Sequence, residues 1–156
     1  MKKRTYLIVA GLAACIAIVA GALVHVISGR AMLYEIPSGY KGWIFIQFQD
    51  PACPPLLTKG IFRVVKILPG GRACTSGSGP EGTYFVRFEY VYPDGTRRKL
   101  SSSTSSGGDA LVRLLTYDPN DKSEIDFVGN KDEFMHAGSP PYPRHRSNTD
   151  GQLFTN

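Results

Sequence analysis

The feature that most limits what this chain can fold into is an apolar segment near its N-terminus. Residues 5–28 read TYLIVAGLAACIAIVAGALVHVIS, 24 residues without Lys, Arg, Asp or Glu, and His25 is the one strongly polar intrusion. A bilayer core about 30 Å thick needs roughly 20 apolar helical residues. The segment therefore predicts a transmembrane anchor rather than a helix of a soluble core.

The flanking charges predict the orientation of this anchor. Residues 1–4 are MKKR, and basic residues concentrate on the cytoplasmic side of membrane helices. We expect a basic cytoplasmic stub (residues 1–4), an anchor (residues 5–28) and a C-terminal domain outside the cytoplasm, either periplasmic or extracellular. The predicted location is the cytoplasmic membrane, which the chain crosses once.

Two alternatives change the anchor but not the compartment. Ala20-Gly21-Ala22 has the small-x-small form of a signal-peptide cleavage site, which would make the protein secreted. Leu12-Ala13-Ala14-Cys15 has the form of a lipobox, which would make Cys15 a lipid-attachment site. Against lipidation, the apolar run continues for more than ten residues beyond Cys15, where lipoproteins usually become polar.

The rest of the chain reads as short strands separated by turns. WIFIQFQ places Ile44, Ile46 and Phe48 on one face, and TYFVRFEYVY alternates in the same way. Pro93-Asp94-Gly95 predicts a hairpin into residues 96–100, and ALVRLLTY, although compatible with a helix, is interpreted as a strand. Further strands are predicted at residues 33–36, 61–67 and 122–128, with turns at residues 69–71.

These elements predict a mainly β domain over residues 32–136, built as a small antiparallel β-sandwich or a barrel-like sheet. One short C-terminal helix is expected after Asn130, because NKDE has the capping-box pattern, with Glu133 three residues after the cap. SSSTSSGG (residues 101–108) has the composition of a flexible loop. Residues 137–156 form a flexible Pro-rich tail.

Two of the three cysteines, Cys53 and Cys74, lie in this domain. In an oxidising compartment such a pair predicts a disulfide. A bridge between Cys53 and Cys74 would close a loop of 21 positions, and a bridge of this kind stabilises a fold by on the order of 3 kcal/mol. The alternative is a small thiol-dependent enzyme acting on cell-wall or peptide substrates, with Cys74 as nucleophile and His136 as base, and it requires both cysteines to be unpaired.

Other familiar chemistries have little support. Three of the 18 basic residues lie in MKKR, which leaves residues 30–156 with 15 basic against 13 acidic residues and no charge signal for nucleic acid. GSGPEG (residues 77–82) matches G-x-G-x-x-G but contains a proline and precedes a strand, so it predicts a loop. We expect no cofactor and no metal site, and we interpret Asp118, Asp121 and Asp126 as turn caps and solvated strand residues. No catalytic set is predicted.

One possible binding surface stands at the start of the first long strand. Tyr40 and Trp43 flank Gly42, and aromatic side chains at a loop edge can stack on sugars or peptides. The competing interpretation, which we favour, places Trp43 in the core of the sandwich. Both residues are therefore candidates rather than assignments.

The stretch IPSGYKGWIFIQFQDPACPPL (residues 36–56) resembles a family of uncharacterised bacterial exported domains that open with I-P-x-G-Y-x-G-W and continue to C-P-P-L. Thr75-Ser76, Phe127-Val128-Gly129 and Asp132-Glu133-Phe134 extend the resemblance to most of the domain. It implies an envelope location behind a lipoprotein signal or a membrane anchor, and no activity. The sequence thus predicts a non-catalytic, membrane-anchored envelope module that binds another, unknown envelope component or contributes structurally.

Overall fold

The computed structural model describes residues 31–80, 85–103 and 111–140, together with 15, 16, 18, 19 and 21. Most of the predicted anchor, the predicted stub and the tail from residue 141 lie outside the described residues. The described residues inside the anchor segment are helical, and among all described residues no helix is long and apolar enough to cross a membrane.

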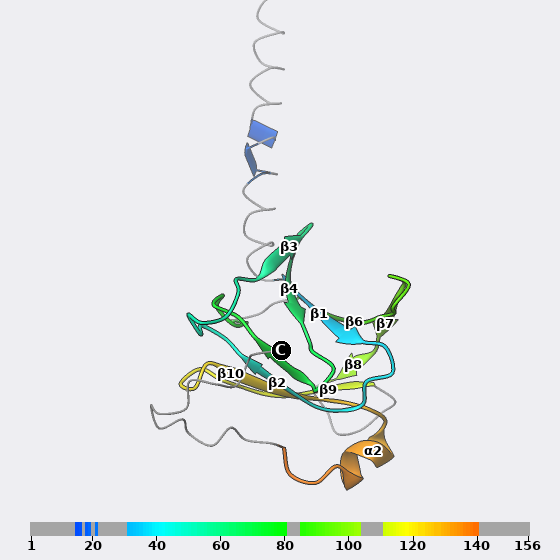
Figure 1. Cartoon of the computed structure of the whole chain (residues 1–156). Coiled ribbons are helices and arrows are strands. Elements are labelled where there is room, and N and C mark those ends of the chain that lie inside the picture. Colours follow the sequence, from blue (N-terminus) through cyan, green and yellow to red (C-terminus); the bar gives the residue numbers. More distant parts are fainter. Residues whose placement is uncertain are drawn as a thin grey trace, which may run out of the picture.

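The domain consists of two five-stranded sheets and one short helix (Figure 1). The first sheet has the strand order β3 (Leu57–Lys59), β4 (Phe62–Lys66), β1 (Ala31–Pro37), β6 (Phe85–Val91) and β7 (Arg97–Leu100). The second has the order β5 (Arg72–Cys74), β2 (Gly42–Gln47), β10 (Ser123–Val128), β9 (Val112–Asp118) and β8 (Ser102–Ser103). Helix α2 spans Lys131–His136.

The core lies between the two sheets. It joins inward-facing residues of β1 and β6 to those of β2 and β10, and its central members are Met32, Tyr34, Ile36, Ile44, Ile46, Phe48, Phe88 and Val128. The predicted inward faces of β2 and β6 are confirmed, since Ile44, Ile46 and Phe88 are completely buried. A sandwich is therefore the correct alternative, and the sheets do not close into a barrel.

The expectation of an antiparallel sandwich is wrong for part of each sheet. β1 pairs in parallel with both β4 and β6, and β2 pairs in parallel with β5. The chain alternates between sheets: β1 leads to β2 in the second sheet, and β4 leads to β5 there before β6 returns. A strand in the opposite sheet thus supplies the crossover that parallel neighbours require.

The predictions for individual elements agree with the structure more closely. ALVRLLTY is a strand, and Tyr92 to Thr96 turns β6 into the antiparallel β7 as predicted. The predicted loop at residues 101–108 begins with a short edge strand, β8, instead. The cap of α2 is confirmed, because Asn130 accepts from the amide of Glu133 and Glu133 accepts from the amide of Asn130, each at 2.8 Å.

Candidate functional site

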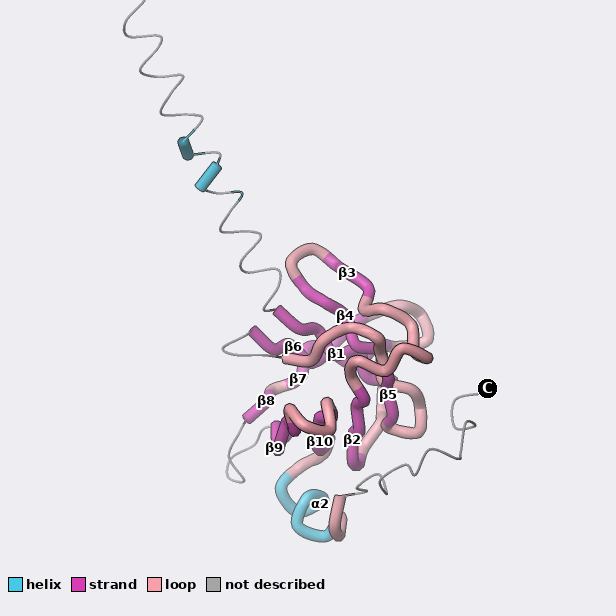
Figure 2. The backbone as a smooth tube through the Cα atoms, turned by 90° about the vertical axis from the view of Figure 1, so that its left-hand side faces the viewer, coloured by secondary structure: helices cyan, strands magenta, loops and turns pink. Residues whose placement is uncertain are grey.

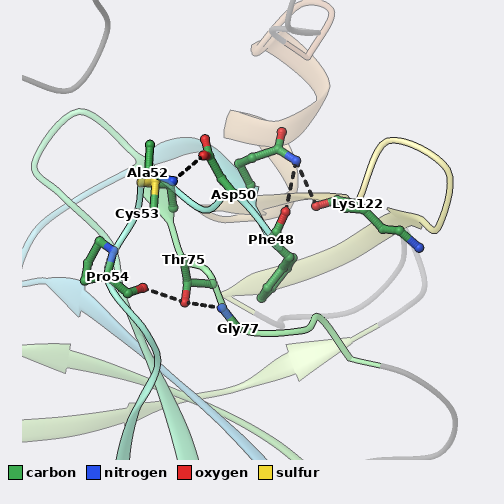
Figure 3. The surroundings of a disulfide bond; sticks show 10 residues. Phe48, Asp50, Ala52, Cys53, Pro54, Thr75, Gly77 and Lys122 are labelled. Atoms are coloured by element: carbon green, nitrogen blue, oxygen red, sulfur yellow. Dashed lines mark hydrogen bonds between the residues drawn. A yellow bond between two sulfur atoms is a disulfide. The ribbon is translucent and has the colours of Figure 1, made fainter.

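The predicted disulfide is present between Cys53 and Cys74, which are 21 positions apart. The segment after Cys53 is held by Thr75, whose hydroxyl donates to the carbonyl of Pro54 at 2.9 Å and accepts from the amide of Gly77 at 3.0 Å (Figure 3). The amide of Ser76 also donates to the carbonyl of Pro54. Thr75-Ser76 therefore fixes the chain next to the bridge, and Thr75 is only 3 % exposed.

Tyr40 is anchored from both sides in the turn between β1 and β2. Its hydroxyl donates to the carbonyl of Trp43, and its own carbonyl accepts from the hydroxyl of Tyr90 at 2.7 Å. The Tyr40 hydroxyl also occupies the space where a side chain at Gly71 would begin, and Gly71 has a φ of +75°. Burial raises the pKa of Tyr40. These contacts give Tyr40 a structural role in joining the turn at Gly71 to β2.

Trp43 lies on the outer face of the second sheet, not in the core between the sheets as we favoured. Its ring makes edge contacts with Phe127 on β10 and Phe134 on α2, at centroid distances of 5.1 and 5.9 Å. The indole N–H donates to the carbonyl of Ala137 at 3.3 Å. The reason is the strand alternation: Trp43 precedes Ile44, which takes the inward position.

Helix α2 completes this outer surface, which we call the α2 cluster (Trp43, Arg113, Phe127 and Phe134). The guanidinium of Arg113 lies 5.3 Å from the centroid of the Phe134 ring and is almost fully buried. Beside the cluster, Lys41 forms an exposed ion pair with Glu133, which raises the pKa of Lys41 and lowers that of Glu133. Met135 on the same helix is 67 % exposed. The half-buried Trp43 thus packs against α2, a helix that also carries an exposed apolar side chain and one member of an ion pair.

A second polar site lies inside the sandwich and was not predicted. Glu124 and Asp126 project from β10 toward the first sheet and are 3 % and 1 % exposed. The hydroxyl of Tyr34 on β1 donates to Oε2 of Glu124 at 2.7 Å. Burial raises the pKa of Glu124 to about 7, although hydrogen bonds with Tyr34 and Asp126 act in the opposite direction. Asp126 is therefore not the solvated strand residue that we expected, whereas Asp118 does cap a turn.

A further carboxylate pair lies on the outer face of the first sheet, where Glu35 and Glu89 are neighbours on parallel strands. Arg97 donates to Glu35 at 2.6 Å and to Glu89 at 3.3 Å, and Arg87 pairs with Glu89. The hydrogen bond with Glu35 raises the pKa of Arg97. Arg97 therefore neutralises two nearly buried carboxylates.

The thiol-enzyme hypothesis finds no support in this arrangement. Cys74 is in the disulfide and pairs with Gln47 at one end of β2, whereas His136 belongs to α2, which packs against Trp43 at the other end. No metal-binding group of three or more His, Cys, Asp or Glu occurs in the described part of the chain. Cys15 is an exposed free cysteine.

Comparisons with known proteins give a family and a fold. A family model described as "Family of unknown function (DUF6843)" matches residues 28–132. A crystal structure described as a "Putative Lipoprotein from Bacillus anthracis" aligns with a TM-score of 0.52 at 19 % identity, covering 76 % of this chain and 84 % of that one. No curated protein matches the chain significantly in sequence. The expected membership of an uncharacterised family is confirmed, and the fold is shared with that structure.

Proposed function

Because the chain belongs to the Family of unknown function (DUF6843), which supplies no activity, we propose that it is a membrane-anchored, non-catalytic module of the bacterial envelope. Residues 5–28 hold it in the cytoplasmic membrane, and the β domain, outside the cytoplasm, binds another envelope component through the exposed side of α2, which packs over the α2 cluster and carries Met135. The lipoprotein description of the structural neighbour and the Cys53–Cys74 disulfide both support an exported domain.

The observation that carries this proposal is the immediate join between the anchor segment and the fold. The apolar segment ends at residue 28, and β1, the central strand of the first sheet, begins at Ala31. Three residues of extended chain span at most about 11 Å. A domain tethered so closely remains at the membrane face, which suits a display or binding module.

Anchoring is tested by fractionating the cells that make the full chain. We expect the protein to stay in the membrane pellet after alkaline extraction and to become sensitive to external protease in spheroplasts. Metabolic palmitate labelling and globomycin sensitivity distinguish acylation of Cys15 from an uncleaved helix. Release of the wild-type chain into the soluble fraction would refute anchoring in both forms.

Binding at the α2 cluster is tested by photo-crosslinking in cells, with benzoylphenylalanine placed at Met135 or, as a control, at the exposed Asp94 in the turn between β6 and β7. We expect a discrete adduct with an envelope component only from position 135. Equal adduct patterns from the two positions would count against this surface.

The disulfide is tested by the mass of the purified, non-reduced protein after alkylation. We expect Cys53 and Cys74 to remain unmodified until reductant is added. Labelling of Cys74 by a mild alkylating probe, lost in a His136→Ala variant, would instead favour the thiol enzyme.

A further inference from the structure

The outer face of the first sheet changes from apolar to charged along its strands. The register places Phe62 and Phe85 on either side of Ala31, where three parallel strands begin. The next row contains Leu57, Val64 and Leu33, and it ends at the charged Arg87. Farther along, the row consists of charged residues: Lys66, Glu35, Glu89 and Lys99.

Several apolar side chains in and beside these first two rows are open to solvent. Phe85 is 66 % exposed, Leu57 is 57 % exposed, and Ile61 in the turn between β3 and β4 is 38 % exposed. We call Leu57, Ile61, Phe62 and Phe85 the strand-start patch. Exposed apolar side chains gathered on one surface mark a contact with a partner or a membrane.

Of the four basic residues in β3, β4 and β5, one lies beside this patch. Arg63 bonds to Ser78 and Gly79, Lys66 belongs to the charged row and Arg72 lies in the second sheet, which leaves Lys59. Lys59 is exposed and pairs with Phe62 in the first row. Apolar and basic side chains together match an anionic lipid surface, where the rings enter the interface and the ammonium groups meet phosphate.

The position of the patch identifies which lipid surface is available. Ala31, in the same row as Phe62 and Phe85, is within about 11 Å of residue 28, where the apolar segment ends. Because neighbouring strands lie about 4.8 Å apart, Phe62 and Phe85 lie one strand to either side of Ala31 and close to the same end of the apolar segment. In both views of the chain, β3 lies at one end of the domain and α2 at the other (Figures 1 and 2).

We propose that the strand-start patch rests on the outer surface of the bilayer that holds residues 5–28, with Phe85 and Ile61 in the headgroup layer and Lys59 against anionic lipid. This inference rests on the proposed anchor. It fixes the orientation of the domain, with the α2 cluster directed away from the membrane and accessible to a partner.

The test uses quenching of tryptophan fluorescence by lipids brominated on their acyl chains. The full chain is reconstituted into liposomes containing phosphatidylglycerol, and Trp43→Phe supplies a background without tryptophan. In that background, Phe85→Trp is compared with Met135→Trp, a matched exposed apolar position on α2. We expect brominated lipid to quench the first variant roughly twofold and leave the second unchanged.

Two further measurements show which lipid property is recognised and which proposal fails. Lys59→Glu, or liposomes of phosphatidylcholine alone, should reduce the quenching of Phe85→Trp. Equal quenching at positions 85 and 135, in chains that float with the liposomes and resist alkaline extraction, would overturn this inference and leave the anchor intact. Chains that do not float would overturn the anchor, and this inference with it.

Discussion

Two pairs of acidic residues in this domain are nearly buried, and the protein accommodates them differently. Glu35 and Glu89, on the outer face of the first sheet, bond to the guanidinium groups of Arg97 and Arg87. Glu124 and Asp126, between the sheets, bond to each other, and Glu124 also accepts from the Tyr34 hydroxyl. The first pair is accommodated by neighbouring positive charge, whereas burial raises the pKa of Glu124 to about 7.

The largest effect on the free energy of unfolding should come from titrating Glu124 in the pair between the sheets (Glu124 and Asp126, the inner pair). The pKa of Glu124 is about 7 in the folded chain against an ordinary value of 4.5, so the folded state binds more protons between these values. The contribution of Glu124 to stability is complete below pH 4.5 and is lost as the pH rises through 7. Chemical denaturation of the full chain in detergent should show that the free energy of unfolding decreases by roughly 3 kcal/mol over this pH range.

Glu124→Gln is the matched variant for this titration, because an amide cannot ionise. It should be less sensitive to pH than the wild-type protein over the same range. If both proteins lose the same free energy of unfolding, the inner pair is not the source of the pH dependence.

The next largest effect should come from removing the positive charge that faces Glu35 and Glu89 (the outer pair). Arg97→Met leaves Glu35 without its ion-pair partner and should lower the free energy of unfolding by about 2 kcal/mol, less than for a fully buried pair because Arg97 is partly exposed. Adding Glu35→Gln should restore most of the loss. Arg98→Met, at the exposed neighbouring position, is the control and should change stability little.

A smaller effect is expected from Tyr34→Phe, which removes the hydroxyl that donates to Glu124. The lost hydrogen bond should cost about 1 kcal/mol. Since that bond lowers the pKa of Glu124, the pH midpoint measured by denaturation should also move upward. A stability loss without a shift of the midpoint would show that Tyr34 acts only through packing.

The smallest effect should come from Arg87→Met. Arg87 is about half exposed and Glu89 retains its bond to Arg97, so we expect a loss below about 1 kcal/mol that shrinks further in high salt. A loss as large as that of Arg97→Met would show that the two arginines share the outer pair equally.

The sequence predicts what depends on neighbours along the chain. Alternation in β2 and β6, the Asn130 cap and the turn before β7 are local patterns, and each is present. Sheet membership and the parallel pairs depend on contacts between distant segments, for which no local signal exists. The cysteine pair was predictable from its compartment, and the outer position of Trp43 follows from the alternation of β2. The packing of α2 over Trp43 was not predictable, because it joins distant segments.

The acidic residues of SEIDFV (β10) illustrate the limit of what the sequence alone can predict. Alternation alone separates Glu124 and Asp126 from Ile125 and Phe127 and favours the apolar pair as the inner one. In the structure both faces of β10 are covered, and the acidic residues take the inner position. Hydrogen bonds with Tyr34 on β1 and with Asp126 explain how that interior accepts Glu124.

The central place of β1 in its sheet also has a consequence for how the domain assembles. β1 is the first strand to leave the ribosome, but its hydrogen-bonding partners β4 and β6 begin at Phe62 and Phe85, and β10, which pairs with β2, ends at Val128. Long-range pairings of this kind are slow to form. The Cys53–Cys74 loop is synthesised well before β10, and a chain truncated before Ser123 lacks the partner that joins β2 to β9. In the nascent chain β1 can therefore complete its pairing only after β6 has been made, and β2 only after β10, the last described strand, has been made.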